Sequence, residues 1–173
     1  MAYPTYSDAL IARILLSVKT IAMVGASPNE VRPSSFAMKY LTEKGFKIIP
    51  VNPGQAGKEI MGQKVYASVS DIPGPVDMVD VFRNSEAAGP VTDEVIANKA
   101  RLGVKVLWMQ LGVINEEAAK RAEAAGLTVI MNRCPKIEYG RLSGEIGWYG
   151  FNRRIIDNRK PFAFAQGGSL RRG

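Results

Sequence analysis

The chain has 173 residues, of which 46% are hydrophobic and 23% charged, and its formal net charge is +7. This length allows one sizeable core, and no apolar run approaches the ~20 residues of a membrane span. There is no histidine, and the single cysteine is Cys134. These counts exclude an internal disulfide, histidine-based triads and phosphohistidine chemistry, and they favour a soluble cytoplasmic protein. The positive charge favours anionic partners, from phosphorylated cofactors to nucleic acid.

The N-terminal segment is interpreted as a helix rather than a signal peptide. It lacks a basic stretch at its start, and Asp8 and Arg13 interrupt its apolar run. Ser7 is suited to the N-cap position. A helix beginning there places these residues on one face: Leu10, Ile14 and Val18.

Five short runs rich in β-branched and aliphatic residues predict the strands of a parallel sheet. They lack strict alternation, as expected of strands that are covered by helices on both faces. In chain order they span residues 20–25, 47–51, 76–82, 104–109 and 127–131.

Helix-like segments separate most of these predicted strands. They include residues 35–44, 90–101 and 115–125. The second connection, residues 53–75, is irregular and contains four glycines. Each of the three helical segments is followed by a glycine suited to end it: Gly45, Gly103 and Gly126.

The alternation predicts an α/β fold, a Rossmann-like, doubly wound, parallel five-stranded sheet in three layers. Right-handed crossovers favour the strand order 3-2-1-4-5, counted along the chain, with a reversal between strands 1 and 4. Ligands of such sheets bind beyond the carboxyl ends of the strands at the reversal. The two loops expected to flank that cleft are Gly25-Ala26-Ser27 and Gln110-Leu111-Gly112.

The loop that opens at Gly25 carries the pattern of a phosphate site. It leads into a helix beginning near Ser35, whose free backbone N–H groups and dipole attract anions. Ser27 can donate a hydroxyl, and Arg32 offers a fork of donors suited to phosphate oxygens. The alternative is an ordinary strand-to-helix turn in which Ser34 or Ser35 caps the helix.

The same loop does not match the dinucleotide fingerprint G-x-G-x-x-G. Ser27 and Glu30 stand where that pattern needs glycine. Asn52 follows the second predicted strand, where an NAD site normally has Asp or Glu for the ribose hydroxyls. An NAD(P)-dependent or other nucleotide-sensing protein is therefore the alternative to a different nucleotide ligand.

Side chains at the ends of strands 3 and 4 are further candidates. Phe82 and Arg83 place an aromatic ring beside a cation, which could line an adenine pocket or simply precede a helix. Asp80 lies inside the third strand without a histidine partner, and we expect a structural role for it. Trp108 is expected in the core, whereas Gln110 is polar where the cleft opens.

Together these loops resemble the YccU-type family of stand-alone coenzyme A-binding domains. The resemblance covers residues 11–138, and a more distant one is to the coenzyme A-binding domain of the succinyl-CoA synthetase α subunit. Seven motifs carry it, in order along the chain: Val24-Gly25-Ala26-Ser27, Arg32-Pro33-Ser34, Met38-Lys39-Tyr40-Leu41, Val51-Asn52-Pro53, Asp80-Val81-Phe82-Arg83, Trp108-Met109-Gln110-Leu111-Gly112-Val113 and Asn132-Arg133-Cys134-Pro135.

The resemblance implies that coenzyme A or an acyl-CoA binds at the carboxyl edge of the sheet. The Gly25 loop and Arg32 would meet phosphates, the second and third strand ends would surround the nucleotide, and the fourth would face the cofactor across the cleft. The residues expected to bind coenzyme A are Gly25, Ala26, Ser27, Arg32, Ser35, Val51, Asn52, Pro53, Phe82, Arg83, Met109, Gln110, Leu111, Asn132 and Cys134.

Two departures limit what the resemblance transfers. The synthetase uses a second domain with a phosphorylated histidine, and this chain lacks both, so binding transfers and ligase chemistry does not. Relatives often have Asp where this chain has Asn132. We therefore expect a carrier, sensor or regulatory module, with no catalytic residue and no metal site identified, that could form a homo-oligomer.

Cys134 is either a small buried residue or a thiol within reach of the coenzyme A thiol.

The chain is predicted to comprise a coenzyme A-binding domain, residues 1–138, and a basic extension, residues 139–173. The extension has seven Arg or Lys side chains against Glu145 and Asp157. It is expected to be disordered or to contact a partner subunit, and a role in nucleic-acid binding is the alternative. That alternative depends on Arg153, Arg154, Arg159, Lys160, Arg171 and Arg172.

Overall fold

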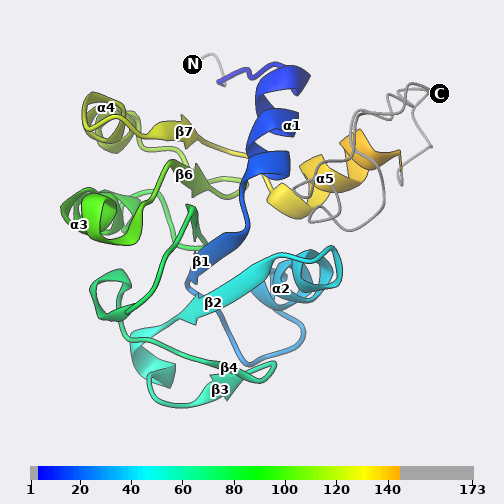
Figure 1. The fold of residues 1–173 in the computed structure, drawn as a ribbon, viewed down its shortest axis with the longest axis vertical. Helices are drawn as coiled ribbons and strands as arrows, with labels where there is room; N and C mark the ends of the chain where they lie inside the picture. Colours follow the sequence, from blue (N-terminus) through cyan, green and yellow to red (C-terminus); the bar gives the residue numbers. More distant parts are fainter. Residues whose placement is uncertain (1–3, 145–173) are drawn as a thin grey trace.

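A computed structural model describes residues 4–144 of the chain. Its centre is a parallel five-stranded sheet with helices on both faces, as predicted (Figure 1). Within the described residues, no helix has both the length and the apolar character needed to cross a membrane. The strands are β1 (Thr20–Val24), β2 (Lys47–Val51), β5 (Met78–Val81), β6 (Val106–Met109) and β7 (Thr128–Ile130).

The predicted strand order was wrong. The strands lie in the order β2-β1-β5-β6-β7, which is 2-1-3-4-5 in the numbering of the predicted strands, because β5 pairs with β1 and not with β2. The outer edge of β2 is already occupied by Tyr66, whose N–H donates to the carbonyl of Pro50 at 3.1 Å and whose carbonyl accepts from Asn52 at 2.9 Å. Pro50 lacks an N–H, and such a residue is confined to edge strands. The third strand is therefore added on the other side of β1.

The connection between β2 and β5 is irregular, as expected. It contains two 3₁₀ turns, η1 (Pro53–Gln55) and η2 (Val69–Asp71), and a small antiparallel pair, β3 (Glu59–Ile60) and β4 (Gln63–Lys64). This pair extends beyond β2 at the edge of the molecule (Figure 1).

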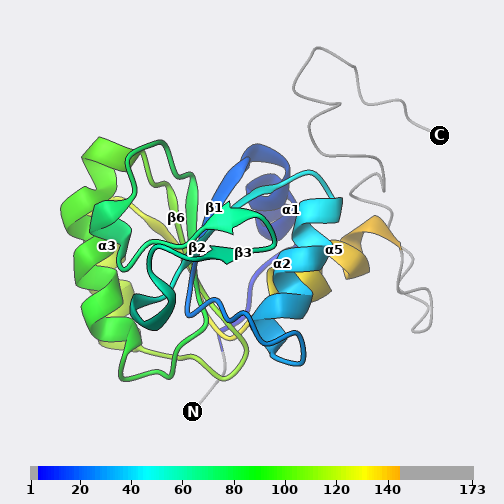
Figure 2. The ribbon, with the colours of Figure 1, turned by 90° about the horizontal axis from the view of Figure 1, so that it is seen from below.

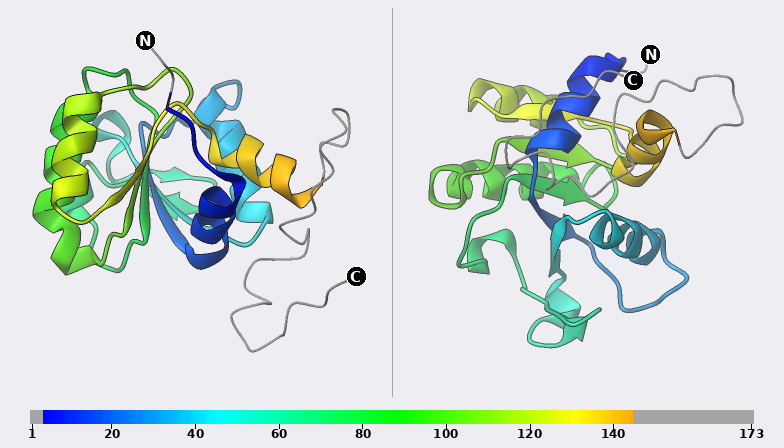
Figure 3. Two further views of the ribbon diagram at one scale, coloured as in Figure 1. Left: turned by 90° about the horizontal axis from the view of Figure 1, so that it is seen from above. Right: turned by 45° about the vertical axis from the view of Figure 1, so that its right-hand side comes forward.

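In the part of the chain that the structure describes, five helices form the outer layers. One layer contains α1 (Asp8–Ser17), α2 (Pro33–Glu43) and α5 (Pro135–Ser143), and the other contains α3 (Ala88–Leu102) and α4 (Glu116–Ala124). Figures 2 and 3 show these two groups on opposite sides of the sheet. The expected cap of α1 is confirmed, since the Ser7 hydroxyl accepts from the Leu10 N–H at 3.1 Å.

Helix α5 was not predicted, and it crosses the expected domain boundary after Glu138. Tyr139 and Leu142 are 0% and 1% exposed, in the core between the sheet and the layer of α1, α2 and α5. Arg141 binds Asp8 of α1 at 2.8 Å and Glu138 at 2.6 Å, which joins the first helix to the last. Packed structure thus continues through Ser143, and the basic side chains from Arg153 onward lie outside the described residues.

Candidate functional site

The loop after β1 lies directly against the loop after β5. Gly25 has φ +90° and donates its N–H to the carbonyl of Val51 at 2.9 Å. A Cβ atom at this position would lie 2.3 Å from the carbonyl oxygen of Phe82. Both the left-handed backbone and the close approach require glycine, so Gly25 holds two of the expected cofactor loops together.

The turn between Gly25 and α2 is held by its own serines. The Ser27 hydroxyl accepts from the Asn29 N–H at 3.1 Å. The Ser35 hydroxyl is 4% exposed and lies 2.8 Å from the carbonyl oxygen of Ser27 and 2.7 Å from that of Asn29. Within residues 4–144, the N–H groups of Ala26 and Ser27 donate no hydrogen bond. Ser35 therefore shapes a turn whose backbone donors are available to an anion.

Two arginines lie near this loop with their guanidinium groups exposed. Arg32 is the residue before α2, with Pro33 at the first helical position, and Arg83 follows β5. Neither side chain forms a hydrogen bond or an ion pair within the described part of the chain. Both retain the full set of guanidinium donors.

Asn52 connects two of the expected cofactor loops. Its side-chain nitrogen donates to the carbonyl of Ala26 at 2.8 Å, and its side-chain oxygen accepts from the Gly54 N–H at 2.9 Å. Val51 before it is buried, and Pro53 after it is exposed. The Asn52 amide thus positions the Gly25 loop.

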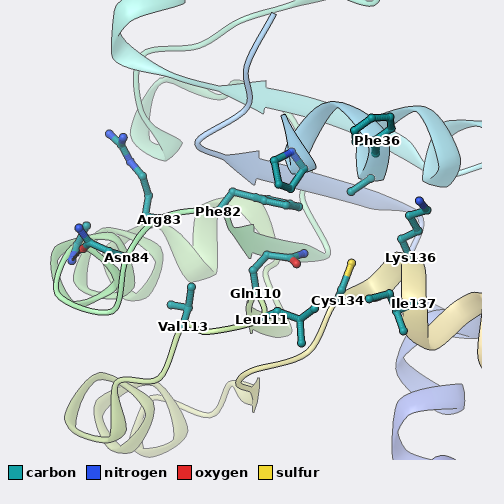
Figure 4. Close-up of a pocket in the computed structure, with 13 residues that line it drawn as sticks. Phe36, Phe82, Arg83, Asn84, Gln110, Leu111, Val113, Cys134, Lys136 and Ile137 are labelled. Atoms are coloured by element: carbon teal, nitrogen blue, oxygen red, sulfur yellow. Dashed lines mark hydrogen bonds between the residues drawn. The ribbon is translucent and has the colours of Figure 1, made fainter. Parts of the chain in front are cut away.

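A pocket of about 710 Å³ lies at the carboxyl edge of the sheet, between the N-termini of α2 and α5, and reaches toward α3. Figure 4 shows Arg83 and Asn84 at one end, Phe36, Lys136 and Ile137 at the other, and Phe82 and Gln110 between them. Five of the residues expected to bind the cofactor line this pocket: Phe82, Arg83, Gln110, Leu111 and Cys134.

The corrected strand order moves the reversal point of the sheet. It lies between β1 and β5, so the loop at Phe82 faces Gly25 directly. Gln110, which the predicted order placed opposite Gly25, lies one strand further along. The cleft is at the predicted edge of the sheet. Its lining includes residues that follow three strands, β5, β6 and β7.

Met109 at the end of β6 and Asn132 after β7 are among the expected residues that do not line the pocket. Met109 is fully buried in the core between the sheet and the layer of α3 and α4. Asn132 has φ +55°, and its side-chain oxygen accepts from the Gly112 N–H at 2.8 Å, so it holds the turn after β6 against the turn after β7.

Eight lining residues were not predicted. Two of them, Lys136 and Ile137, lie in the first turn of α5, and the signal that could have revealed this helix is Pro135 at its first position with Gly144 at its end. The others lie in α2, between β5 and α3, and after β6: Pro33, Phe36, Ala37, Asn84, Ala87 and Val113.

A buried carboxyl group lies beneath the pocket. Asp80 is 0% exposed, in β5 between Met23 of β1 and Trp108 of β6. The Gln110 side-chain nitrogen lies 3.0 Å from both of its oxygens. Burial raises the pKa of Asp80 to about 8, although the Gln110 hydrogen bond lowers it. The expected structural role of Asp80 is thus to orient Gln110, and Trp108 lies in the core as predicted.

Cys134 is part of the pocket lining. It is the residue before α5 and is 8% exposed. Burial raises the pKa of its thiol, while hydrogen bonds from the backbone of Ile137 and Lys136 lower it and the charge of Asp80 raises it. The protonated thiol is therefore the dominant form at neutral pH.

A family model described as a CoA binding domain matches residues 19–140 of the chain. The chain belongs to this family of CoA-binding domains. The match includes every strand of the sheet and the first turn of α5.

Individual relatives agree with this assignment. The Bacillus subtilis protein YneT is 40% identical over 133 residues, which are 77% of this chain and 94% of YneT. A solved structure of a Pyrococcus horikoshii protein is 38% identical with a TM-score of 0.74, covering 83% of this chain and all of that one. The ADP-forming acetate–CoA ligase II of Archaeoglobus fulgidus is 34% identical over 113 residues, 64% of this chain but 16% of the ligase. The chain thus resembles whole small proteins and one part of a larger ligase.

Proposed function

We propose that this protein binds coenzyme A or an acyl-CoA along the carboxyl edge of its sheet, as a carrier, sensor or regulatory module. The observation that carries the proposal is the pocket of about 710 Å³ beside a glycine loop, in a chain of the CoA-binding domain family. The ligase relative is named for a reaction of coenzyme A, which supports the same ligand class.

The phosphates would bind at the polar end of the site. The N–H groups of Ala26 and Ser27 precede the N-terminus of α2, where backbone donors and the helix dipole favour an anion. The guanidinium groups of Arg32 and Arg83 would each add a charge-assisted hydrogen bond. These donors suit the diphosphate and the ribose phosphate of coenzyme A.

The pantetheine arm would lie in the pocket. This arm alternates short apolar stretches with amide groups, and the pocket offers an aromatic side chain, Phe82, beside the amide of Gln110. Because the Gln110 nitrogen donates to Asp80, its oxygen is left to accept an N–H from a pantetheine amide. Asp80 would thus act on the ligand only through the orientation of Gln110.

An NAD(P) ligand is a weaker candidate. An NAD site needs a group after β2 that receives the ribose hydroxyls, and both polar atoms of the Asn52 side chain already bind backbone groups of the chain. That arrangement favours a nucleotide whose ribose is recognised elsewhere.

Thermal unfolding with different nucleotides tests the proposal. A ligand that binds the folded state shifts the unfolding equilibrium, so coenzyme A should raise the melting temperature more than NAD or NADP at equal concentration. Native mass spectrometry of the freshly purified protein provides an independent measurement, since retained coenzyme A adds its own mass. Stabilisation by NAD without stabilisation by coenzyme A would reject the proposal.

A further inference from the structure

Exposed apolar side chains gather at one end of the pocket. Within the described residues, six large hydrophobic side chains are exposed, and three of them line this pocket: Phe36, Leu111 and Ile137, at 54%, 56% and 43%. They come from α2, from the loop after β6 and from α5, so the fold brings together segments that are far apart in the sequence. Scattered exposed apolar residues need no explanation, but a cluster beside a pocket is typical of a binding surface.

This apolar end is separated from the end suited to phosphate. Arg83 and Asn84 lie at one end of the pocket, and Phe36 and Ile137 lie at the other, near Cys134 (Figure 4). A coenzyme A molecule with its phosphates near Arg83 would direct its sulfur toward Phe36 and Ile137. A group attached to that sulfur would therefore lie on the apolar side chains.

The cation at the apolar end is already engaged within the protein. The Lys136 ammonium lies 5.8 Å from the ring centroids of both Phe36 and Tyr40, a cation–π arrangement. A carboxylate on the acyl group would have to draw Lys136 from these rings. An uncharged chain does not meet this obstacle.

We propose that the ligand is an acyl-CoA thioester with an uncharged, apolar acyl chain, and that this chain packs on Phe36, Leu111 and Ile137. The inference rests on the proposed function, because it extends the same coenzyme A site to the acyl group. The substrate class that the apolar end selects is acyl chains longer than acetyl and uncharged, in preference to short acyl groups and to acyl groups that end in a carboxylate.

Calorimetric titration of the full chain with a series of thioesters tests this inference. The ligands are coenzyme A, acetyl-CoA, hexanoyl-CoA, octanoyl-CoA and succinyl-CoA. Each methylene buried against the apolar side chains should lower the dissociation constant roughly two- to fourfold from acetyl to hexanoyl. Succinyl-CoA should bind no more tightly than acetyl-CoA.

Matched variants identify the side chains that are responsible. Phe36→Ser and Ile137→Ser should each reduce the ratio between the affinities for octanoyl-CoA and coenzyme A by about three- to tenfold. Leu16→Ser is the control, because Leu16 is also an exposed apolar side chain, 38% exposed on α1, but does not line the pocket. It should leave that ratio unchanged.

The outcomes separate this inference from the proposed function. If coenzyme A and every thioester fail to bind, the proposed function is wrong and the inference with it. If coenzyme A binds but affinity is independent of chain length, the inference alone is overturned. Tighter binding of succinyl-CoA than of octanoyl-CoA would also overturn it, and would indicate that Lys136 selects a carboxylate.

Discussion

The two faces of the sheet are built from different kinds of residue. Toward α3 and α4 the core is aliphatic, with Val79, Leu107 and small alanines such as Ala118 and Ala122 in close contact. Toward α1, α2 and α5 it contains bulky aromatic and polar side chains, among them Trp108, Tyr139 and the buried Asp80.

The pocket lies mainly on the aromatic face, between the N-termini of α2 and α5. The layer of α3 and α4 therefore serves stability, whereas the layer of α1, α2 and α5 serves stability and the site together. Changes on the aromatic face should therefore alter both folding and ligand binding.

The largest expected effect comes from removing the end of α5. A chain that ends at Glu138 loses the buried side chains of Tyr139 and Leu142. Truncations of this size in a core cost roughly 2–5 kcal/mol each, which is comparable with the whole stability of a typical domain. We expect this chain to lose its cooperative thermal transition, measured by circular dichroism.

A shorter truncation provides the control. A chain that ends at Gly150 lacks residues 151–173 but keeps all of α5. It should unfold at the same temperature as the full chain and bind coenzyme A equally well, while any DNA binding or self-association of the extension is reduced. Cooperative unfolding of the chain that ends at Glu138 would contradict the role assigned to α5.

The second effect is on the pH dependence of stability, to which Asp80 on the aromatic face contributes. Burial raises the pKa of Asp80 to about 8, whereas an unfolded Asp titrates near 3.9. Between these values the unfolded chain binds fewer protons, so a rise in pH favours unfolding by at most about 1.4 kcal/mol per pH unit. The stability that the neutral carboxyl group provides is complete below about pH 4 and is lost by about pH 8.

Asp80→Asn should abolish this contribution, because an amide of the same shape does not ionise. The free energy of unfolding in urea should therefore rise relative to the unmodified chain from pH 5 to pH 8, and the difference should stay constant above pH 8. Glu117→Gln, at an exposed carboxylate of α4, should change little at any pH. An unchanged pH dependence in Asp80→Asn would mean that Asp80 is ionised in the folded protein.

The sequence was sufficient for the five strands of the sheet but not for their order or for helix α5. Runs of aliphatic residues predicted all five strands of the sheet, since burial on both faces leaves a continuous apolar pattern. The pairing of β5 depends on which edge of the sheet is free, and this depends on Tyr66, which lies in a connection without periodicity. Pro50 was a usable signal, because it marks β2 as an edge strand.

The site was predictable only in part for a related reason. The carboxyl ends of parallel strands all lie at one edge of the sheet. Phe82 and Gln110 follow such ends, so their place at the pocket could be predicted. Phe36 and Ile137 come from helices whose rotation about their axes depends on packing, which no local pattern predicts. The polar side-chain atoms of Asn52 were expected near the nucleotide, and they bind the backbone of Ala26 and of Gly54.

A third, smaller effect is expected at the polar end of the site. Arg32→Ala should weaken coenzyme A binding by about 1.5–3 kcal/mol, because a guanidinium–phosphate contact is a charge-assisted hydrogen bond. Isothermal titration calorimetry measures this change. Arg13→Ala removes an exposed arginine of α1 outside the site and should leave the affinity unaltered. If the two variants bind coenzyme A equally well, Arg32 does not contact the phosphates.

The smallest effect concerns the thiol at the end of the aromatic face. Cys134 lines the pocket and precedes α5, so the proposed sulfur of coenzyme A would lie within its reach. Incubation with coenzyme A disulfide should let the Cys134 thiolate attack one sulfur, forming a mixed disulfide and releasing one coenzyme A thiolate. Because burial raises the pKa of this thiol, the adduct should form slowly at pH 7 and faster at higher pH. The intact mass of the protein before and after reductant measures the adduct, and Cys134→Ser is the control. If protein that binds coenzyme A forms no adduct, Cys134 has a packing role alone.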